Sequence, residues 1–464
     1  MSTHVFYAST AFGLATLAAA AEDGLFPDAD RRVLVLSNNA GIPETAYGVA
    51  DVAGIALLIE AFDDVYSYND AIAPQHPSLW QPQVVDLPIW ERSLRSLWAL
   101  EGDIHLVVES IQVRPALALC QTFADAAIDV YADGLISYGP TRIKLPAQIG
   151  MRVERLLHLD LVPKVRPLLL REYGVRSSLI STESFQKVVA GIAAASRPAP
   201  LTGFGSPTVV LLGQHLSALQ LMTVEEERQL HLAMVETAVA AGFDELMFKT
   251  HPAAPPGLNG ALVRRADELG ARLTVRDAPE LVETWYASGE VDLVVGCLST
   301  GLATAALYGV PAARAGTELL LERLNPYETS NRMAATVITA TVPPLQGVAD
   351  GADHRADNAP TLTTEQVVNT VGYLMQPTRN SDLRDAALAL LEQRFEELRP
   401  YVRRSRLSQL GLPAGGGTDL PGNSEPKQPG PPDAAAPVAE SDPGSQLGRR
   451  LNSVRRLLSA RRAR

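Results

Sequence analysis

Three short segments of this 464-residue chain place polar side chains directly after apolar runs that are typical of buried strands. In chain order these segments span residues 130–138, 246–255 and 291–304. Ligands of open parallel sheets bind at the carboxyl ends of the strands. The three segments are therefore the first places where the sequence predicts chemistry.

The first segment carries a carboxylate next to a glycine. Asp133 follows an apolar run, and Gly134 permits a sharp turn and the close approach of a ligand. A carboxylate at this position could accept the proton of an incoming hydroxyl group. Asp-Gly is also among the commonest turn pairs, and the segment taken alone favours a simple turn.

The second segment carries two basic side chains after a strand. Lys249, His251 and Pro252 follow the apolar run Leu246–Phe248, and the proline keeps the chain out of a helix. His251 could donate a hydrogen bond or a proton to a phosphate oxygen, with the charge of Lys249 beside it. His76-Pro77 is a second His-Pro pair without such a strand, so the strand and not the dipeptide is the signal.

The third segment places two hydroxyl groups between a strand and a helix. The strand ends at Gly296, Ser299 and Thr300 lie in a turn of small residues, and a helix begins near Gly301. Two hydroxyls with free backbone N–H groups at a helix start form an anion site that suits phosphate. An ordinary N-cap by either hydroxyl is the alternative, and it is compatible with phosphate binding.

Short apolar strands alternate with helical patterns and must position these segments. Together they predict an α/β protein with doubly wound parallel sheets covered on both faces. The expected strands are His4–Ala8, Arg32–Ser37, Ile104–Glu109, Ile128–Ala132, Thr208–Leu212, Glu245–Lys249, Arg272–Val275 and Leu293–Gly296. The expected helices include one that ends near Gly24, and Arg114–Asp125, Val224–Ala241 and Gly260–Leu269.

A break rich in Pro, Gly and Ser at residues 196–207 divides the chain into two Rossmann-like domains. We expect residues 1–200 to bind the acceptor and supply the base, and residues 208–380 to bind a nucleotide-sugar donor across a shared cleft. Residues 381–412 are expected to form a helix that could pack back across the cleft. Residues 413–444 are predicted to be a disordered Pro/Gly-rich linker, and residues 445–464 a basic amphipathic helix.

Charge is distributed unevenly along the chain. The net charge is −12, yet residues 445–464 carry seven arginines and no acid, and residues 413–444 carry five acids and one lysine. Residues 1–412 therefore hold a net charge of −15, which argues against nucleic-acid binding. The basic C-terminal segment suits either an anionic membrane surface or a solvated tail.

The remaining composition argues against several classes of protein. Two cysteines, Cys120 and Cys297, exclude a disulfide scaffold and a zinc site built from cysteines, and they predict buried thiols. The remaining histidines lack metal-ligand spacing, so no metal and no cofactor is expected. No basic residue precedes the apolar stretch Thr10–Ala21, so we expect a strand and helix rather than a signal peptide. The expected location is the cytoplasm, with the C-terminal segment as a candidate contact to the inner face of the membrane.

The three motifs together suit the transfer of a sugar from a nucleotide donor, because one half offers a base and the other holds a leaving phosphate. In their order and spacing they resemble the bacterial polysialyltransferase and sialyltransferase family of GT-B architecture. The matching residues are Ala132-Asp133-Gly134, His251-Pro252 and Ser299-Thr300. The first acidic position of that family's motif is Ala132 in this chain.

The resemblance implies an inverting transfer from CMP-sialic acid to a glycan hydroxyl without an essential metal. Carried over residue by residue, Asp133 is the general base and His251 assists departure of the CMP phosphate. Ser299 and Thr300 hold that phosphate, with Lys249 and Pro252 beside them. The implied role of the chain is in the biosynthesis of a cell-surface polysaccharide.

Further polar residues at strand ends or in loops are weaker candidates for the cleft, and a turn or cap role is the alternative for each. They are Asn38, Glu109, Ser110, Gln214, Glu328 and Asn331.

Four other functions stay open at this stage. CMP-Kdo or another CMP-activated acid would require the same phosphate contacts, and a UDP-sugar transferase would require an acidic ribose clamp that the second half does not display. Nucleotide-sugar 2-epimerases share the two-domain shape but need further acids and histidines in the cleft. A nucleotide-sugar-binding protein without turnover is the fourth alternative, and Ala132 is the reason to consider it.

Overall fold

The computed structural model describes residues 2–132, 134–196, 208–251, 259–349 and 362–416. They belong to one compact unit that spans residues 1–418. Asp133, Pro252 and the predicted segments beyond residue 416 lie outside the described residues, as does nearly all of the predicted break at 196–207.

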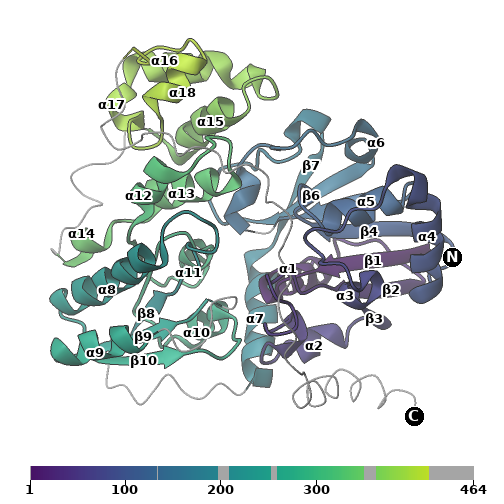
Figure 1. The fold of residues 1–464 in the computed structure, drawn as a ribbon, viewed down its shortest axis with the longest axis horizontal. Coiled ribbons are helices and arrows are strands. Elements are labelled where there is room, and N and C mark those ends of the chain that lie inside the picture. Colours follow the sequence, from purple (N-terminus) through teal and green to yellow (C-terminus); the bar gives the residue numbers. More distant parts are fainter. Residues whose placement is uncertain (1, 133, 197–207, 252–258, 350–361, 417–464) are drawn as a thin grey trace, which may run out of the picture. The chain divides into compact units, whose positions relative to one another are not determined.

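Two parallel sheets organise the described part of the chain (Figure 1). The first sheet has seven described strands in the order β3-β2-β1-β4-β5-β6-β7, and the second has five in the order β10-β9-β8-β11-β12. The strands of the first sheet are β1 (Ser2–Ala8), β2 (Arg31–Leu36), β3 (Asp64–Ser67), β4 (Asp103–Glu109), β5 (Ala127–Tyr131), β6 (Val153–Leu159) and β7 (Arg176–Ile180). Those of the second are β8 (Thr208–Leu212), β9 (Glu245–Lys249), β10 (Arg272–Arg276), β11 (Leu293–Gly296) and β12 (Ala312–Arg314).

Helices connect these strands, as parallel pairing requires. In the first half they are α1 (Ala11–Glu22), α2 (Ala56–Ile59), α3 (Tyr68–Ile72), α4 (Leu87–Leu97), α5 (Ala116–Thr122), α6 (Ala147–Gly150) and α7 (Thr182–Ser196). In the second half they are α8 (Val224–Ala240), α9 (Gly260–Glu268), α10 (Val282–Ser288), α11 (Gly301–Leu307), α12 (Thr317–Arg323), α13 (Ser330–Thr341) and α14 (Leu345–Ala349). The last helices are α15 (Thr364–Met375), α16 (Arg384–Gln393), α17 (Phe395–Leu398) and α18 (Arg404–Gln409).

Single 3-10 turns complete the elements. They are η1 (Val49–Asp51), η2 (Val84–Asp86), η3 (Gly134–Tyr138), η4 (Arg171–Tyr173) and η5 (Ser381–Leu383).

Both faces of each sheet are buried. In β1, Val5 and Tyr7 pack into one apolar cluster, while Phe6 and Ala8 pack into another on the opposite face. The central strand β8 alternates in the same way between two clusters. This double coverage explains the near-continuous apolar runs and confirms the predicted GT-B-like α/β class with two doubly wound halves. All eight expected strands are present.

Four strands escaped the sequence analysis because their patterns are weak. β3 and β7 are polar edge strands, β6 begins with Val-Glu-Arg, and β12 has only three residues. A strand at a sheet edge buries less apolar surface than a central one, so its sequence carries less of the strand signal.

The expected single helix over 381–412 is wrong. The segment breaks into η5, α16, α17 and α18. Arg394 leaves helical geometry at φ −135°, and Pro400 prevents α17 from continuing past Arg399. The start of this segment contacts the first half, since Asp382 of η5 pairs with Arg171 at 2.5 Å. Just before the segment, the Gln376 amide donates to the Arg142 carbonyl.

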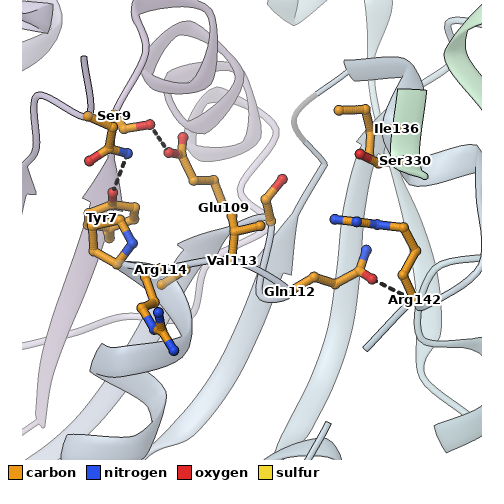
Figure 2. Close-up of a pocket in the computed structure, with 13 residues that line it drawn as sticks. Tyr7, Ser9, Glu109, Gln112, Val113, Arg114, Ile136, Arg142 and Ser330 are labelled. Atoms are coloured by element: carbon orange, nitrogen blue, oxygen red, sulfur yellow. Dashed lines mark hydrogen bonds between the residues drawn. The ribbon is translucent and has the colours of Figure 1, made fainter. Parts of the chain in front are cut away.

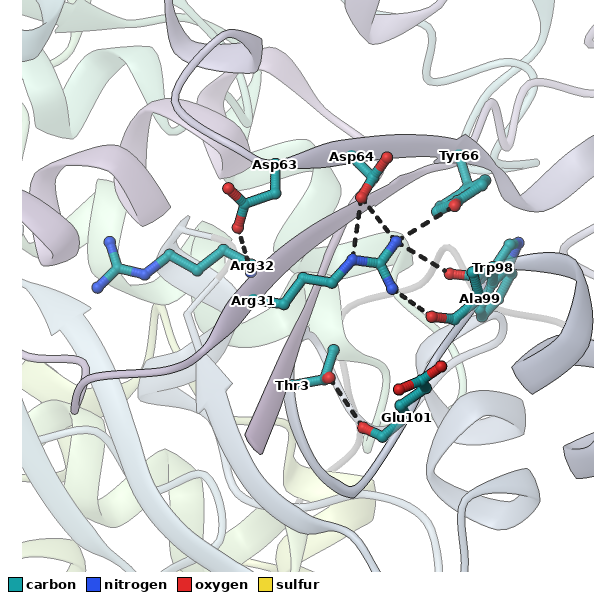
Figure 3. Close-up of polar contacts among 9 residues, drawn as sticks. All are labelled: Thr3, Arg31, Arg32, Asp63, Asp64, Tyr66, Trp98, Ala99 and Glu101. Atoms are coloured by element: carbon teal, nitrogen blue, oxygen red, sulfur yellow. Dashed lines mark hydrogen bonds and ion pairs between the residues drawn. The ribbon is translucent and has the colours of Figure 1, made fainter. Parts of the chain in front are cut away.

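One arginine fastens the edge of the first sheet (Figure 3). The Arg31 guanidinium donates to the Asp64 carboxylate at 2.6 and 2.9 Å, and to the backbone carbonyls of Trp98 and Ala99. Edge strand β3 is thereby held to β2 and to the chain that leaves α4. These bonds help to keep β3 paired with β2, although β3 is short and only half-buried.

Both cysteines are buried, and burial raises the pKa of each thiol to about 12. The described residues contain no metal-holding group of three or more His, Cys, Asp or Glu side chains. Within the same ranges, every helix falls short of the length and hydropathy required to cross a bilayer.

We expect His4 to make stability depend on pH. Burial, together with the charges of His105 and Arg32, lowers the pKa of His4 to about 4. As pH falls below 6.5, His4 is protonated in the unfolded chain but stays neutral in the folded one. The free energy of unfolding therefore decreases between pH 6.5 and 4. The stability advantage of wild type over His4→Gln should therefore shrink by about 3 kcal/mol across this range in urea unfolding.

The control is His76→Gln, because His76 lies in a loop and is only half-buried. A wild-type advantage over His4→Gln that stays constant from pH 7 to pH 4 would contradict the prediction.

Candidate functional site

The strand order of each sheet reverses at one point. In the first sheet the chain moves outward from β1 through β2 to β3 and then returns to the other side with β4. In the second sheet the same reversal lies between β8 and β11. Loops diverge at such switch points and leave a crevice at the carboxyl ends of the strands. The two crevices are therefore the expected binding places.

A cavity of about 210 Å³ opens at the β1/β4 switch point (Figure 2). Its lining mixes polar and apolar groups and comes from the end of β1, from the chain after β1 and β2, from the end of β4 and the loop to α5, from η3 and from the start of α13. Tyr7, Ser9 and Glu109 form one side, while Gln112, Arg142 and Ser330 form the other. A space of this size with hydrogen-bonding groups on both sides fits about one sugar ring.

Glu109 anchors one side of the cavity. It ends β4 and is buried, and its carboxylate accepts a hydrogen bond from the Tyr131 hydroxyl at 3.0 Å and another from Ser9. A buried carboxylate is tolerated when such donors replace water. The next residue, Ser110, has φ +38°, a sparsely populated conformation for a residue other than glycine. Backbone strain of this kind clusters at functional sites.

Arg142 is the principal cation of the opposite side. Its guanidinium extends between Gln112 and Ser330 in Figure 2, and its Nε atom is buried without a hydrogen-bond partner among the described residues. Burial lowers the pKa of Arg142. The backbone N–H of Arg142 donates to the Gln112 amide oxygen at 2.5 Å, which fixes the loop. A desolvated cation next to an open cavity is suited to an anionic group.

In the second half, the two loops of the switch point are joined by Gln214. Its amide oxygen accepts from the Leu298 N–H at 3.2 Å, and its amide nitrogen donates to the Gly213 carbonyl at 3.3 Å. The loop that follows β11 then carries Ser299, whose hydroxyl accepts from the Gly301 N–H at 3.1 Å, and Thr300. The Ser299 hydroxyl hydrogen stays available for a ligand.

His251 follows β9 at the same end of the sheet. Its ring lies 6.0 Å from the His215 ring, between centroids, and the residue is exposed at its surface. The surrounding protein, the His215 ring and the Lys249 charge lower the pKa of His251 to about 4, so the imidazole is neutral at pH 7. Lys249 itself is buried, with its ammonium 5.8 Å above the Trp285 ring. Its charge acts from inside the second half.

The first and third motifs meet. Gly134 has φ +76°, and a Cβ atom there would lie only 2.3 Å from the Thr300 hydroxyl oxygen. Only glycine combines that backbone conformation with so close an approach. The turn that follows β5 in the first half is thus in contact with the start of α11 in the second half.

The site geometry can be set beside known proteins. A model of the alpha-2,8-polysialyltransferase family matches residues 4–316. The chain belongs to the alpha-2,8-polysialyltransferase family. Membership makes it a glycosyltransferase, as the sequence analysis predicted, and the comparison with curated proteins finds no match.

Solved structures similar to this polysialyltransferase-family chain are distant. A Staphylococcus aureus MnaA–UDP structure has a TM-score of 0.42 and 11% identity, and the match covers 80% of this chain and 96% of that one. A putative UDP-N-acetylglucosamine 2-epimerase from Listeria monocytogenes has a TM-score of 0.41 and 12% identity, with coverages of 85% and 97%. Acinetobacter baumannii MurG has a TM-score of 0.39 and 12% identity, with coverages of 83% and 94%.

The structure of this polysialyltransferase-family chain separates the weaker candidates. Glu109 and Ser110 line the cavity, whereas the Gln214 side chain links the loops that follow β8 and β11. Asn38 does not line this cavity, since its amide donates to the Pro43 and Ala46 carbonyls, and its place in the wider cleft stays a prediction. Its neighbour Asn39 lines the cavity instead and donates to the Tyr7 hydroxyl.

Two candidates near the start of α13 also lie outside the lining of this cavity. Glu328 pairs with Arg406 at 2.8 Å, and Asn331 is not among the residues that line the cavity, whereas Ser330 is. Arg142 and Gln112 were missed because each lies several residues beyond a strand end, where the chain has already turned. Ser9 directly follows β1, and the strand-end rule applied to that strand would have found it.

We expect Gly134→Ala to damage both stability and activity. The new Cβ clashes with Thr300, and the positive φ adds strain, so the free energy of unfolding should fall by about 1–3 kcal/mol. Removing the Thr300 hydroxyl in Gly134→Ala/Thr300→Ala should recover part of that loss. Gly41→Ala is the matched control, because nothing lies within 4 Å of its Cβ position. Equal denaturation midpoints for the two single variants would refute the close contact.

Proposed function

We propose that this glycosyltransferase moves a sialic acid, or a related nonulosonic acid, from a CMP donor to a glycan hydroxyl with inversion at the anomeric carbon. Family membership supports the class of reaction. The observation that carries the proposal is the contact between Gly134 and Thr300. It joins the turn after β5, where the proposed base belongs, to the proposed phosphate site.

In this proposal the acceptor occupies the cavity at the β1/β4 switch point. Glu109 and Ser9 offer hydrogen bonds to sugar hydroxyls, and Arg142 offers a charge-assisted bond to an anionic group of the acceptor. Ile136 of η3 lines the same cavity only two residues after Gly134. An acceptor held there has its hydroxyl within reach of the chain that carries Asp133.

Asp133 is proposed as the general base. Consecutive Cα atoms are about 3.8 Å apart, so Asp133 is tied to the Gly134–Thr300 contact by chain connectivity. A carboxylate takes the proton from the acceptor hydroxyl as the oxygen attacks the anomeric carbon. Attack from the face opposite the nucleotide gives inversion.

The donor phosphate is proposed to lie at the β8/β11 switch point, beside Pro252 and the hydroxyls of Ser299 and Thr300. His251 is neutral because its pKa lies near 4. It therefore assists the leaving CMP as a hydrogen-bond donor rather than as an imidazolium acid. The charge of buried Lys249 attracts the phosphate electrostatically from inside the second half, without a direct contact.

The first test is a screen of CMP-sialic acid, CMP-Kdo and UDP-sugar donors for nucleotide release. We expect CMP release from CMP-sialic acid or a related CMP donor, with turnover lowered about 10²-fold or more in Asp133→Ala and in His251→Ala. His251→Gln should retain more activity than His251→Ala, because the glutamine amide still donates a hydrogen bond. His76→Ala is the control.

Each alternative has its own outcome in this screen. Release of UDP would assign the enzyme to the UDP-sugar transferases, and interconversion of the sugar without transfer would assign it to the epimerases. Tight CMP binding without release under any acceptor would identify a binding protein.

The second test addresses the acceptor side. Arg142→Ala should raise the KM for an anionic glycan acceptor about tenfold, the loss of one charge-assisted hydrogen bond. Hydrolysis of the donor in the absence of acceptor should be unchanged. Arg166→Ala is the matched control, because Arg166 is an exposed arginine of the same half. An unchanged acceptor KM would remove Arg142 from the acceptor site.

A further inference from the structure

The loop that follows β8 is fastened to α8 at both ends. The Glu227 carboxylate accepts from the Leu216 N–H at 2.8 Å and from the Ser217 N–H at 3.0 Å. His231, one turn further along α8, accepts at Nε2 from the Gln214 N–H at 3.3 Å. Both side chains are buried. Helix α8 thus fixes the backbone on either side of one residue, His215.

The hydrogen bond to His231 requires a neutral imidazole. An imidazole nitrogen that accepts a hydrogen bond must be unprotonated, and burial lowers the pKa of His231. The Phe248 ring packs edge-on against His231 at 5.1 Å between centroids. The two backbone N–H groups bond different oxygens of Glu227, Oε1 and Oε2, whereas an amide has only one acceptor oxygen.

His215 is presented toward His251. The two rings lie 6.0 Å apart at 48°, and His215 is only partly buried. The His215 ring forms no hydrogen bond to another described side chain. The groups around the pair are Lys249, whose charge favours an anion, and Glu227, which is occupied by two N–H groups.

The same loop sets the third motif. Gln214, next to His215, accepts from the Leu298 N–H just before Ser299 and Thr300. One fastened loop therefore fixes the positions of His215 and of the two hydroxyls together. The donor phosphate is proposed to lie where this loop and the loop that follows β11 meet.

We propose that His215 is a second phosphate-binding imidazole that acts together with His251, and that Glu227 is the positioning residue that holds it there. The inference rests on the proposed donor site and adds a binding group to it. Two rings at this separation can each direct an N–H at one phosphate group through hydrogen bonds of about 2.8 Å. The ligand class is a nucleoside monophosphate or its sugar ester.

The experiment compares CMP with cytidine, because only CMP carries the phosphate. By calorimetry, His215→Ala should weaken CMP binding about tenfold and leave cytidine binding unchanged, whereas a merely structural role would weaken both equally. His215→Gln should restore part of the CMP affinity, because its amide donates a hydrogen bond. His76→Ala is the control.

Glu227→Gln tests the positioning role. The amide presents N–H to one of the two backbone N–H groups, so one hydrogen bond is replaced by a donor–donor contact. CMP affinity should fall about as far as in His215→Ala, and the double variant should be little worse than either single one. Melting temperatures of the variants show that each is folded.

Different results would contradict the role of His215 and the proposed CMP donor. If His215→Ala binds CMP as wild type does, His215 is not a phosphate ligand, even when His251→Ala abolishes turnover. If wild type instead prefers UDP to CMP and releases UDP, the CMP assignment fails. A loss of UDP affinity in His215→Ala without a loss of uridine affinity would then still support the second imidazole.

Discussion

The approach of Gly134 to Thr300 is the constraint on which the rest of the site depends. A backbone with positive φ packs against a hydroxyl at a distance that leaves no room for a side chain. The contact joins a strand end of one sheet to a helix start of the other. The proposed transfer between two substrates depends on this junction, because it joins the two switch points.

Around that junction the two halves divide the chemistry by charge. The cavity of the first half combines a buried carboxylate, Glu109, with a partly desolvated cation, Arg142. The second half offers neutral donors, namely hydroxyls and imidazoles, with one buried ammonium behind them. In the proposed function these neutral donors bind a phosphate ester less tightly than cations would, which suits a site that must release its product.

The sequence was sufficient for every interior strand except β6, because burial on both faces produces a continuous apolar run. The polar start of β6, Val-Glu-Arg, hid that strand. It also singled out Gly134 and Thr300, because a glycine turn and a helix-start hydroxyl directly follow apolar strands, although a plain turn and an N-cap account for the same residues. The sequence could not distinguish Asn38 from Asn39, since the two are identical neighbours in one loop. Only the direction of each side chain, which the fold sets, places Asn39 at the cavity. Arg142 and Ser330 reach the cavity through tertiary packing of η3 against α13, which no local pattern records.

The partial burial of Arg142 in a strongly acidic protein has a consequence for how substrates arrive. Residues 1–412 carry a net charge of −15, so an anionic donor or glycan is repelled at long range and attracted only after it enters. Salt screens the long-range repulsion over about 8 Å at physiological ionic strength, but hardly touches a desolvated contact. Association should therefore quicken as ionic strength rises, the reverse of the electrostatic steering seen in enzymes with a basic surface.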